Sequence, residues 1–437
     1  FKPVNFETLV DSPIFAGRNF KRVDLDPGAK LPVRIDIVAD EARDLEIKPE
    51  QLKAHQAMVQ QAYKLFGSQH YDHYDFLLAA SDKLSSIGTE HHRSSENGVD
   101  PGYFTDWDKQ AAERGLLPHE FTHSWNGKFR RPADLATPNF NVPMGDSLLW
   151  VYEGQTQFWG NVVAARSGLV SQDQARDLLA FVAATYDQGR PGLSWRNIQD
   201  TTNDPTISQR RPLSYRNYQM SEDYYQGGQM VWLDVDTRIR ELTKGKRSID
   251  DFAKAFFGVN DGDWKVDPYT FEDVVKTLND ITPYDWAKYL RDRIDGHKGP
   301  IDGIARSGWK LIYTDKPSEA VKAVEARRHF TDMTYSIGVA VSAKGEIADV
   351  RWDGPAFNAG LSPGMTVVAV NNKEFSGDAL KDAVTEAKTG KAPIELLVKN
   401  FDEYKTIRID YHDGLKYPHL ERDKSVPDTL TTLYKAK

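Results

Sequence analysis

The residues most able to do chemistry are His119, Glu120 and His123, which together spell the motif H-E-x-x-H. In a helix, residues four apart lie on one face, so both histidines can direct their imidazoles at a single metal ion. Glu120 then lies beside the metal without binding it, where its carboxylate can take a proton from a water molecule that the metal activates. A catalytic zinc usually has three protein ligands, and Glu153, in the segment Trp150–Gly154, is the expected third. The pattern predicts a zinc hydrolase with one Zn2+ per chain.

The residues around the motif decide how far it can be relied on, because H-E-x-x-H alone arises by chance in about one or two chains per hundred of this length. Leu116 and Leu117 before it and Trp125 after it are apolar, as expected of a buried helix. Histidines buried there without partners would be costly, which favours a metal site. Pro118 is discordant, so the helix must start or kink there.

Length and composition limit the class of protein. A chain of 437 residues predicts two or three domains, and a net charge of −8 with a pI near 5.8 argues against a nucleic-acid-binding surface. No apolar run is long enough to predict a membrane span. Cysteine is absent, so any metal must rest on histidine and carboxylate ligands.

The sequence begins at Phe1, which suggests processing or truncation. The expected location is the periplasm or the outside of a bacterial cell, with the cytoplasm as the alternative.

The first part of the chain predicts a mixed α/β lobe. Residues 1–32 read as loops with an isolated strand, because Pro, Gly and Asp interrupt them. Residues 33–38 alternate as a half-buried strand, and apolar residues recur at helical spacing over 52–66. A second strand is expected over 75–80, with 88–95 as its possible neighbour.

A predominantly helical lobe follows. Asp146 and Ser147 offer an N-cap for the helix that carries Glu153. The expected metal position is the cleft between the two lobes. Further helices are predicted over residues 173–186, 229–242, 249–257, 270–278 and 283–294.

After about residue 304, short strands and turns replace the helices. One helix interrupts them, with an apolar face at Leu380, Ala383, Val384 and Ala387. The strands are predicted over residues 337–341, 347–350, 366–370, 394–398 and 406–409.

Three segments, in this order, carry a family resemblance: Ile87–His91, Trp150–Gly154 and Asp223–Gly228. With the H-E-x-x-H motif, they resemble the glycyl aminopeptidase family of PDZ-containing zinc metallopeptidases, which are thermolysin-like enzymes. The resemblance covers the chain from about Asn5 to the C-terminal region.

The resemblance implies an α+β fold. Its thermolysin-like peptidase domain, with a mixed α/β lobe and a helical lobe, would occupy residues 33–305. Residues 1–32 would be the remnant or linker of an upstream β domain, and residues 306–437 a β-sandwich-like PDZ domain with a C-terminal extension.

The resemblance also implies the role of a tyrosine. In the family, a tyrosine of a Tyr-Tyr-x-x-Gly segment stabilises the tetrahedral intermediate, and Tyr225 matches it. A phenol hydroxyl aimed at the developing oxyanion acts only as charge appears. Tyr224 is the alternative, and either tyrosine could instead only pack at a helix start.

A substrate-binding role is implied for Glu90 and Gly88, because the family's Gly-Gly-x-Glu-His stretch lies on an edge strand and its Glu binds the free amino group of the substrate. A carboxylate paired with an ammonium limits how much chain can lie on that side, which makes an exopeptidase. This chain departs from the pattern, with Ile87 in place of the first glycine and Thr89 where an apolar residue is common.

The C-terminal segment Trp352–Met365 resembles the Pro-Ala-x-x-Ala-Gly-Leu-x-x-Gly-Asp stretch of bacterial PDZ domains, with Met365 in place of the usual Asp. A helix from Asp378 would close the peptide groove. The strand expected to receive a peptide at its edge includes Ile337, Gly338 and Val339. The module could also serve only as a rigid packing partner.

Other candidate side chains are not expected in the site. Single histidines are usually surface or structural residues, and Arg130 and Arg131 after the zinc helix could simply be solvated. The histidines without paired helical spacing are His55, His70, His73, His91 and His92.

These residues predict a zinc-dependent aminopeptidase that hydrolyses the N-terminal peptide bond of peptides, and the resemblance implies a preference for small first residues such as Gly or Ala. The rivals are a thermolysin-like endopeptidase with the same zinc site and a non-catalytic PDZ adaptor. The expected partners are peptides with a free N-terminus and an N-terminal fragment of the same precursor, with no nucleic acid and no membrane span.

Overall fold

The computed structural model describes residues 3–84, 87–207 and 214–437, which form two compact units. Each unit is assembled from separate parts of the sequence. The first comprises Phe1–Ala175, Tyr224–Asp292 and Pro427–Lys437, and the second comprises Arg176–Asp223 and Arg293–Val426. The predicted domain boundaries after residues 32 and 305 remain predictions.

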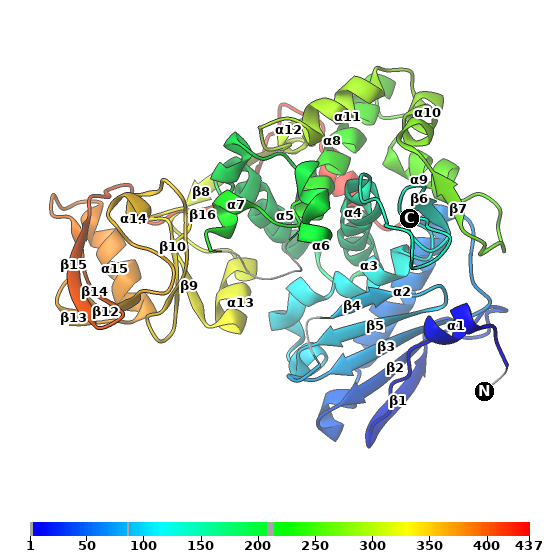
Figure 1. The fold of residues 1–437 in the computed structure, drawn as a ribbon, viewed down its shortest axis with the longest axis horizontal. Helices are drawn as coiled ribbons and strands as arrows, with labels where there is room; N and C mark the ends of the chain where they lie inside the picture. Colours follow the sequence, from blue (N-terminus) through cyan, green and yellow to red (C-terminus); the bar gives the residue numbers. More distant parts are fainter. Residues whose placement is uncertain (1–2, 85–86, 208–213) are drawn as a thin grey trace. The chain divides into compact units, whose positions relative to one another are not determined.

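The first unit contains a five-stranded sheet in the order β1-β2-β3-β5-β4 (Figure 1). The three inner strands run parallel, and both edge strands run antiparallel to their neighbours. Inner parallel strands are covered on both faces, which fits the apolar run of the third strand. The strands are β1 (Asn19–Asp24), β2 (Val33–Ala39), β3 (Tyr74–Ala80), β4 (Gly88–Glu90) and β5 (Ser94–Val99).

The predicted strands over 33–38 and 75–80 are confirmed, but two expectations in this region are wrong. The strand within residues 1–32 is not isolated, because β1 pairs with β2 along its whole length. Residues 88–95 do not form one strand. They divide between β4, at the sheet edge, and the start of β5, which is the actual neighbour of β3.

Helices pack on this sheet and on one another. The predicted helix over 52–66 is α2 (Pro49–Phe66), which starts with a proline in its first turn and ends at Gly67 in the left-handed conformation. The helices predicted over 229–242, 249–257, 270–278 and 283–294 are also present. The helices of this unit include α1 (Phe6–Val10), α2, α3 (Leu116–Thr122), α4 (Leu149–Ser167), α8 (Gln226–Thr243), α9 (Ile249–Phe257), α10 (Phe271–Ile281), α11 (Trp286–Ile294, which ends just beyond the unit) and α16 (Thr429–Tyr434).

The start of α4 differs from the prediction. Its N-cap is Leu148, with no side-chain hydrogen bond to the helix, rather than Asp146 or Ser147. The hydroxyl and backbone N–H of Ser147 donate to Asp134 instead, at 2.6 and 3.1 Å. Ser147 therefore fixes the loop before the helix rather than the helix itself.

Two glycines allow α4 to lie close to its neighbours. A Cβ added at Gly154 would come within 2.7 Å of the Cα of Gly228 in α8, and the reverse substitution gives the same distance. A Cβ at Gly160 would lie 3.0 Å from the Cβ of His119 in α3. The indole N–H of Trp232 also donates to the carbonyl of Trp150 at 3.0 Å. Helix α4 therefore packs between α3 and α8 with backbone contact on the α8 side.

The second unit contains short helices, a two-stranded sheet and a β-rich module. Helix α5 (Gln172–Asp187) continues into it from the first unit, and β8 (Trp309–Thr314) pairs with β16 (Tyr417–Arg422). The remaining helices are α6 (Asp204–Ile207), α7 (Arg216–Gln219), α12 (Asp302–Arg306), α13 (Glu319–Arg328), α14 (Pro355–Asn358) and α15 (Gly377–Ala387).

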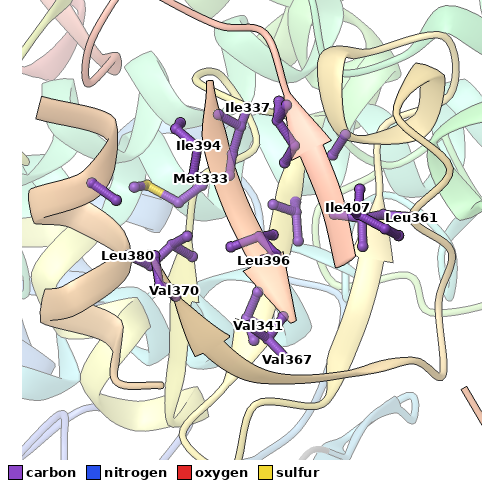
Figure 2. Packing of buried hydrophobic residues seen from close by; sticks show 14 of the residues in the cluster. Met333, Ile337, Val341, Leu361, Val367, Val370, Leu380, Ile394, Leu396 and Ile407 are labelled. Atoms are coloured by element: carbon purple, nitrogen blue, oxygen red, sulfur yellow. The ribbon is translucent and has the colours of Figure 1, made fainter. Parts of the chain in front are cut away.

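The β-rich module has two sheets around one apolar core. The first sheet has the order β11-β10-β9 and the second β13-β12-β14-β15. Met333, Ile337, Val341, Leu380 and Leu396 point into the core between the sheets and α15 (Figure 2). The strands are β9 (Phe330–Asp332), β10 (Val339–Ser342), β11 (Ile347–Val350), β12 (Thr366–Val370), β13 (Lys373–Glu374), β14 (Ile394–Asn400) and β15 (Glu403–Ile409).

Most predicted elements of this module are confirmed, but the strand expected over 337–341 begins only at Val339. Ile337 and Gly338 precede it, and Gly338 adopts a φ of 84°, which lies outside the range of a strand. The chain is thus a mixed α+β protein. No helix among residues 3–84, 87–207 and 214–437 is long and apolar enough to cross a membrane.

The contact between α4 and α8 gives a first prediction. Gly154→Ala should lower the free energy of unfolding by about 1–3 kcal/mol, because the new methyl group overlaps the backbone of α8. Urea denaturation checks this. Gly115→Ala is the matched control, since a Cβ there meets only Asn161 Oδ1, at 3.2 Å. Equal stability of the two variants would show that the helices can separate at no cost.

Candidate metal centre

The H-E-x-x-H motif lies on the short helix α3, whose start explains Pro118. The helix begins at Leu116, so Pro118 is its third residue and lies in the first turn, where backbone N–H groups have no helical partner. The backbone N–H of His119 makes the first regular bond, to the Gly115 carbonyl at 3.1 Å. Of the two alternatives, the helix starts there rather than kinks. His123 is the C-cap residue but keeps helical dihedral angles of −62° and −18°, so both histidines still share one face.

The two imidazoles converge with the carboxylate of Glu153. The Nε2 atoms of His119 and His123 lie 3.1 Å apart. The Oε2 atom of Glu153, from the second turn of α4, lies 3.4 and 3.3 Å from them. These three residues form one of the two groups among the described residues whose ligand atoms could hold a metal ion.

The set fits a zinc ion by its chemistry. Two imidazole nitrogens and one carboxylate oxygen are a donor set of catalytic zinc sites. Within the described part of the chain, the buried Oε2 atom of Glu153 has no hydrogen-bond partner, which is costly unless a cation compensates it.

Asn126 holds the histidine turn against α4. The carbonyl of Asn126 lies 2.9 Å from Nδ1 of His123, so a proton on Nδ1 leaves Nε2 free for a metal. The side-chain amide of Asn126 donates to the carbonyls of Val151 and Tyr152, at 2.8 and 3.0 Å. Asn126 therefore links one predicted ligand to the helix that carries another.

Glu120 lies beside the three predicted ligands and is buried. Burial raises its pKa well above the usual value, and the charges of Glu90 and Glu153 raise it further, while His123 acts in the opposite direction. A carboxylate with a raised pKa holds a transferred proton more readily, which suits a general base.

The edge strand β4 passes directly over Glu120. A Cβ at Gly88 would overlap Oε1 of Glu120, and it would come within 2.9 Å of Leu116 Cδ1. The atoms of Glu90, Glu120 and His123 form the second group whose ligand atoms all lie within 4.8 Å of one another. The predicted substrate-binding residues Gly88 and Glu90 therefore lie at the same centre as the motif.

Glu90 is held in its ionised form. Burial would raise its pKa, but the positive charges of His123 and Lys128 outweigh burial and lower it. The hydroxyl of Tyr152 donates a hydrogen bond to Oε1 of Glu90. An ionised carboxylate at this position can pair with a cationic group of a ligand.

Tyr225 approaches the centre from α8, of which it is the N-cap residue. Its ring stacks at 6.2 Å from the ring of His119, at an interplanar angle of 29°. Tyr224 is only 1% exposed and packs its ring 4.9 Å from that of Tyr225. The ring of Tyr225 thus lies beside a predicted metal ligand.

The other histidines bond to different groups. His55 lies 2.7 Å from the Gln51 carbonyl and 3.1 Å from the Tyr103 hydroxyl. His91 pairs with Asp11 at 3.0 Å. Arg130 pairs with Asp267, and Arg131 donates to the Gly127 carbonyl.

The predicted peptide-receiving edge in the β-rich module is already paired. Strand β10 pairs with β11 on one side and with β9 on the other. The backbone N–H of Met333 also donates to the Val339 carbonyl at 2.8 Å. Of the predicted groove residues, Ile337 is fully buried in the core and Val339 is paired, so the open edge expected at Ile337, Gly338 and Val339 is not present.

Three contributors to the centre were not predicted as site residues: Asn126, Lys128 and Tyr152. Tyr152 directly precedes Glu153 on the helix, but this position alone does not show that its hydroxyl reaches Glu90. Asn126 and Lys128 follow the motif closely, but their types carry no signal of a role because asparagine and lysine are common in turns. Only the fold shows their contacts.

The charges of the centre predict that zinc affinity falls on acidification. Burial acts to lower the pKa of His123, but Glu90 and Glu153 outweigh it and raise the pKa to about 10. In the absence of metal, His123 therefore holds a proton that zinc must displace. We expect zinc affinity to weaken up to about tenfold for each pH unit lost below neutrality. A competing chromogenic chelator measures this, with His55→Gln as the control that keeps wild-type affinity. An affinity independent of pH would contradict the protonated His123.

One solved structure supports the fold, and two others are reported beside it. An aminopeptidase N family protein from Idiomarina loihiensis is similar, with a TM-score of 0.73 and 16% identity over 95% of this chain and 71% of that chain. A mutant M1 zinc metallopeptidase from Deinococcus radiodurans, bound to a Tyr-Ser-Ala substrate, has a TM-score of 0.40 and 14% identity over 64% of this chain and 52% of that chain. Native leukotriene A4 hydrolase from Saccharomyces cerevisiae has a TM-score of 0.37 and 17% identity over 62% of this chain and 39% of that chain. The chain therefore spans about half or less of the latter two proteins.

Sequence comparison adds the family. No curated protein matches the chain in sequence. Residues 112–231 match the model of the M61 glycyl aminopeptidases. That segment contains the two histidines, Glu120, Glu153 and Tyr225. This segment of the chain is therefore similar to the M61 glycyl aminopeptidases, a family of metallo-aminopeptidases.

Proposed function

We propose that the protein is a zinc-dependent aminopeptidase that removes the first residue of peptides with a free N-terminus, with small residues such as Gly and Ala preferred. The observation that carries the proposal is the position of Glu90, whose carboxylate lies within 4.8 Å of Glu120 and His123. An anion so close to the metal-ligating residues can hold a substrate ammonium while the first peptide bond lies at the centre. The preference for small residues rests on the similarity of residues 112–231 to the glycyl aminopeptidases.

His119, His123 and Glu153 would hold the zinc ion. When bound, zinc polarises the scissile carbonyl and lowers the pKa of water to about 7. The chain's own residues perform the proton transfers. Glu120 takes the proton of the attacking water and later delivers it to the leaving amine, and burial in an apolar and acidic surrounding helps it to hold the proton in between.

Tyr225 would stabilise the negative charge that develops on the carbonyl oxygen. Its ring is stacked near His119, so its hydroxyl comes from the side of α8 rather than from the helices that carry the ligands. A donor preorganised in this way contributes about 10²- to 10³-fold in rate when it is aimed at the oxyanion.

The rival functions differ in what they ask of the centre. A thermolysin-like endopeptidase needs no anion beside Glu120, so an ionised Glu90 at that position favours the aminopeptidase. A non-catalytic adaptor needs neither the base nor the ligands, which are all present. The chain therefore carries the full set of groups that hydrolysis requires.

For the β-rich module we propose a PDZ-like fold. The support is the Trp352–Met365 segment, the two-sheet core and the helix α15 beside them. We also propose that an N-terminal fragment of the same precursor is a partner. The proposed location is the periplasm or the outside of a bacterial cell.

The proposed function predicts a strict requirement for a free amino group. Hydrolysis of glycyl-alanine amide should fall by about 10²-fold or more on N-acetylation, because the loss of the charged pair with Glu90 leaves a buried anion without its partner. Comparison of kcat/KM for the two amides measures this. Equal hydrolysis of both would support the endopeptidase.

A zinc-loaded Glu120→Gln variant provides the control. It removes the base but keeps the size of the side chain, so it should bind zinc and lose hydrolysis of both amides. Hydrolysis that persists in this variant would show that the activity belongs to another site or to a contaminant.

A further inference from the structure

We propose that Tyr152 is a positioning residue for substrate recognition: its hydroxyl fixes the carboxylate of Glu90 at a set distance from the metal ligands. The inference rests on the proposed aminopeptidase function and deepens it. Tyr152 directly precedes the ligand Glu153 on α4, and its hydroxyl donates to Oε1 of Glu90 on β4. One hydrogen bond thus joins the edge strand to the ligand-bearing helix.

The tyrosine is itself rigidly held. Its side chain is only 5% exposed, and its ring packs 5.0 Å from that of His123. Gly127, with a φ of 136°, lies against the end of the ring, where a Cβ would come within 2.7 Å of the hydroxyl oxygen. A ring confined between His123 and Gly127 has little freedom to turn its hydroxyl away from Glu90.

The electrostatics of the centre explain why Glu90 needs such a partner. Glu90, Glu120 and Glu153 are three carboxylates in one small space, of which Glu120 is buried and the other two are partly buried, and like charges so close together repel. A neutral donor on Oε1 of Glu90 offsets part of the cost of its charge. Because the Tyr152 hydroxyl binds Oε1, the Oε2 atom of Glu90 is the oxygen available to a substrate ammonium.

The bond also sets the length of chain that the enzyme removes. The ammonium anchor and one metal ligand are supported by consecutive residues of one helix, Tyr152 and Glu153, so their separation cannot vary with movement of the edge strand. Strand β4 has only three residues and is paired on one side, and such a strand is a weak support by itself. Tyr152 therefore supplies the rigidity that β4 lacks.

Two small inhibitors test the role of Tyr152 separately from catalysis. Glycine hydroxamate and acetohydroxamate offer the same metal-binding group, but only the first carries an ammonium. We expect the wild-type enzyme to prefer glycine hydroxamate and Tyr152→Phe to lose about tenfold of that preference, since a hydrogen bond to a charged group contributes about this much. The affinity for acetohydroxamate should not change. Inhibition constants measure both.

Two controls make each result decisive. In Glu90→Gln, the further change Tyr152→Phe should have no added effect, because the two residues act as one unit. Tyr103→Phe removes another buried tyrosine hydroxyl, which contacts His55, and should leave the preference unchanged. If Tyr152→Phe keeps the full preference, or weakens both inhibitors equally, the positioning role is wrong. If wild type itself shows no preference, the aminopeptidase proposal fails instead.

In the β-rich module, a strand of the chain itself lies beside the strand that would receive a peptide in the PDZ-like fold proposed above. Strand β9 lies antiparallel along β10, with Thr331 opposite Val341 and Asp332 opposite Ala340 (Figure 1). A Cβ at Gly377, the first residue of α15, would overlap the hydroxyl of Thr331. Strand β9 thus contacts both β10 and the start of α15, the two elements that border the groove of a PDZ domain.

Charged residues fasten this strand. Glu325, on the helix before β9, accepts a hydrogen bond from the backbone N–H of Asp332 and another from Lys381 on α15, each at 2.8 Å. We infer that β9 is a built-in occupant of the groove, and that a peptide C-terminus binds only when β9 is displaced.

The absence of cysteine permits a clean test with a disulfide. Asp332→Cys with Ala340→Cys joins directly paired residues of antiparallel strands, whose Cα separation suits a disulfide. Thr331→Pro instead removes a backbone donor from β9 and should release it. The probe is a fluorescent, N-acetylated peptide library with random residues and a free C-terminal carboxylate, measured by polarisation against its amidated form.

We expect no carboxylate-dependent binding by the wild type or the oxidised pair, and binding by folded Thr331→Pro. Binding by the oxidised pair would overturn the inference. A Thr331→Pro variant with a wild-type circular dichroism spectrum and no binding would equally show that the groove is not a peptide receptor.

Discussion

The close approach of α4 and α8 at Gly154 and Gly228 is the constraint on which the centre depends. Neither residue has a side chain, so the helices meet at their backbones, and a Cβ on either would lie 2.7 Å from the other's Cα. Glu153 directly precedes one glycine, and Tyr225 lies three residues before the other. The distance between the proposed metal ligand and the proposed oxyanion donor is therefore set by a backbone contact, which varies far less than a contact between flexible side chains.

Helix α4 also positions the remaining groups of the centre. Gly160 brings α4 against His119, and the carbonyls of Val151 and Tyr152 receive the amide of Asn126, whose own carbonyl orients His123. This assembly stabilises a group of charges that is unfavourable by itself, because burial and mutual repulsion both oppose three ionised carboxylates. The apolar packing of α4 offsets that cost. The centre is thus an acidic cluster that a cation, a metal ion or a substrate ammonium, can compensate.

The sequence predicted the groups whose chemistry is inseparable from their spacing. His119 and His123 had to share a face if they lay on any helix, and the structure brings Glu153, Glu120, Glu90 and Tyr225 to them. Contacts that depend on how separate elements pack could not be predicted in this way. Asn126 acts through α4, and Tyr152 through β4, and neither periodicity nor motif reveals such a partner. The pairing of β9 with β10 was not predicted because β9 itself was not predicted: its three residues are too few to show a clear alternation.

The departure of Ile87 from the family's Gly-Gly pattern can now be explained in physical terms. Only the second glycine of the family's pattern, which is Gly88 in this chain, lies against the centre. A Cβ at Gly88 would overlap the carboxylate of Glu120. The side chain of Ile87 is 41% exposed and lies outside β4, while its carbonyl still accepts the N–H of Gly98 from the next strand. A side chain at position 87 therefore leaves the sheet edge intact. The requirement at this edge is for a bare backbone over Glu120, the proposed general base, and one glycine satisfies it.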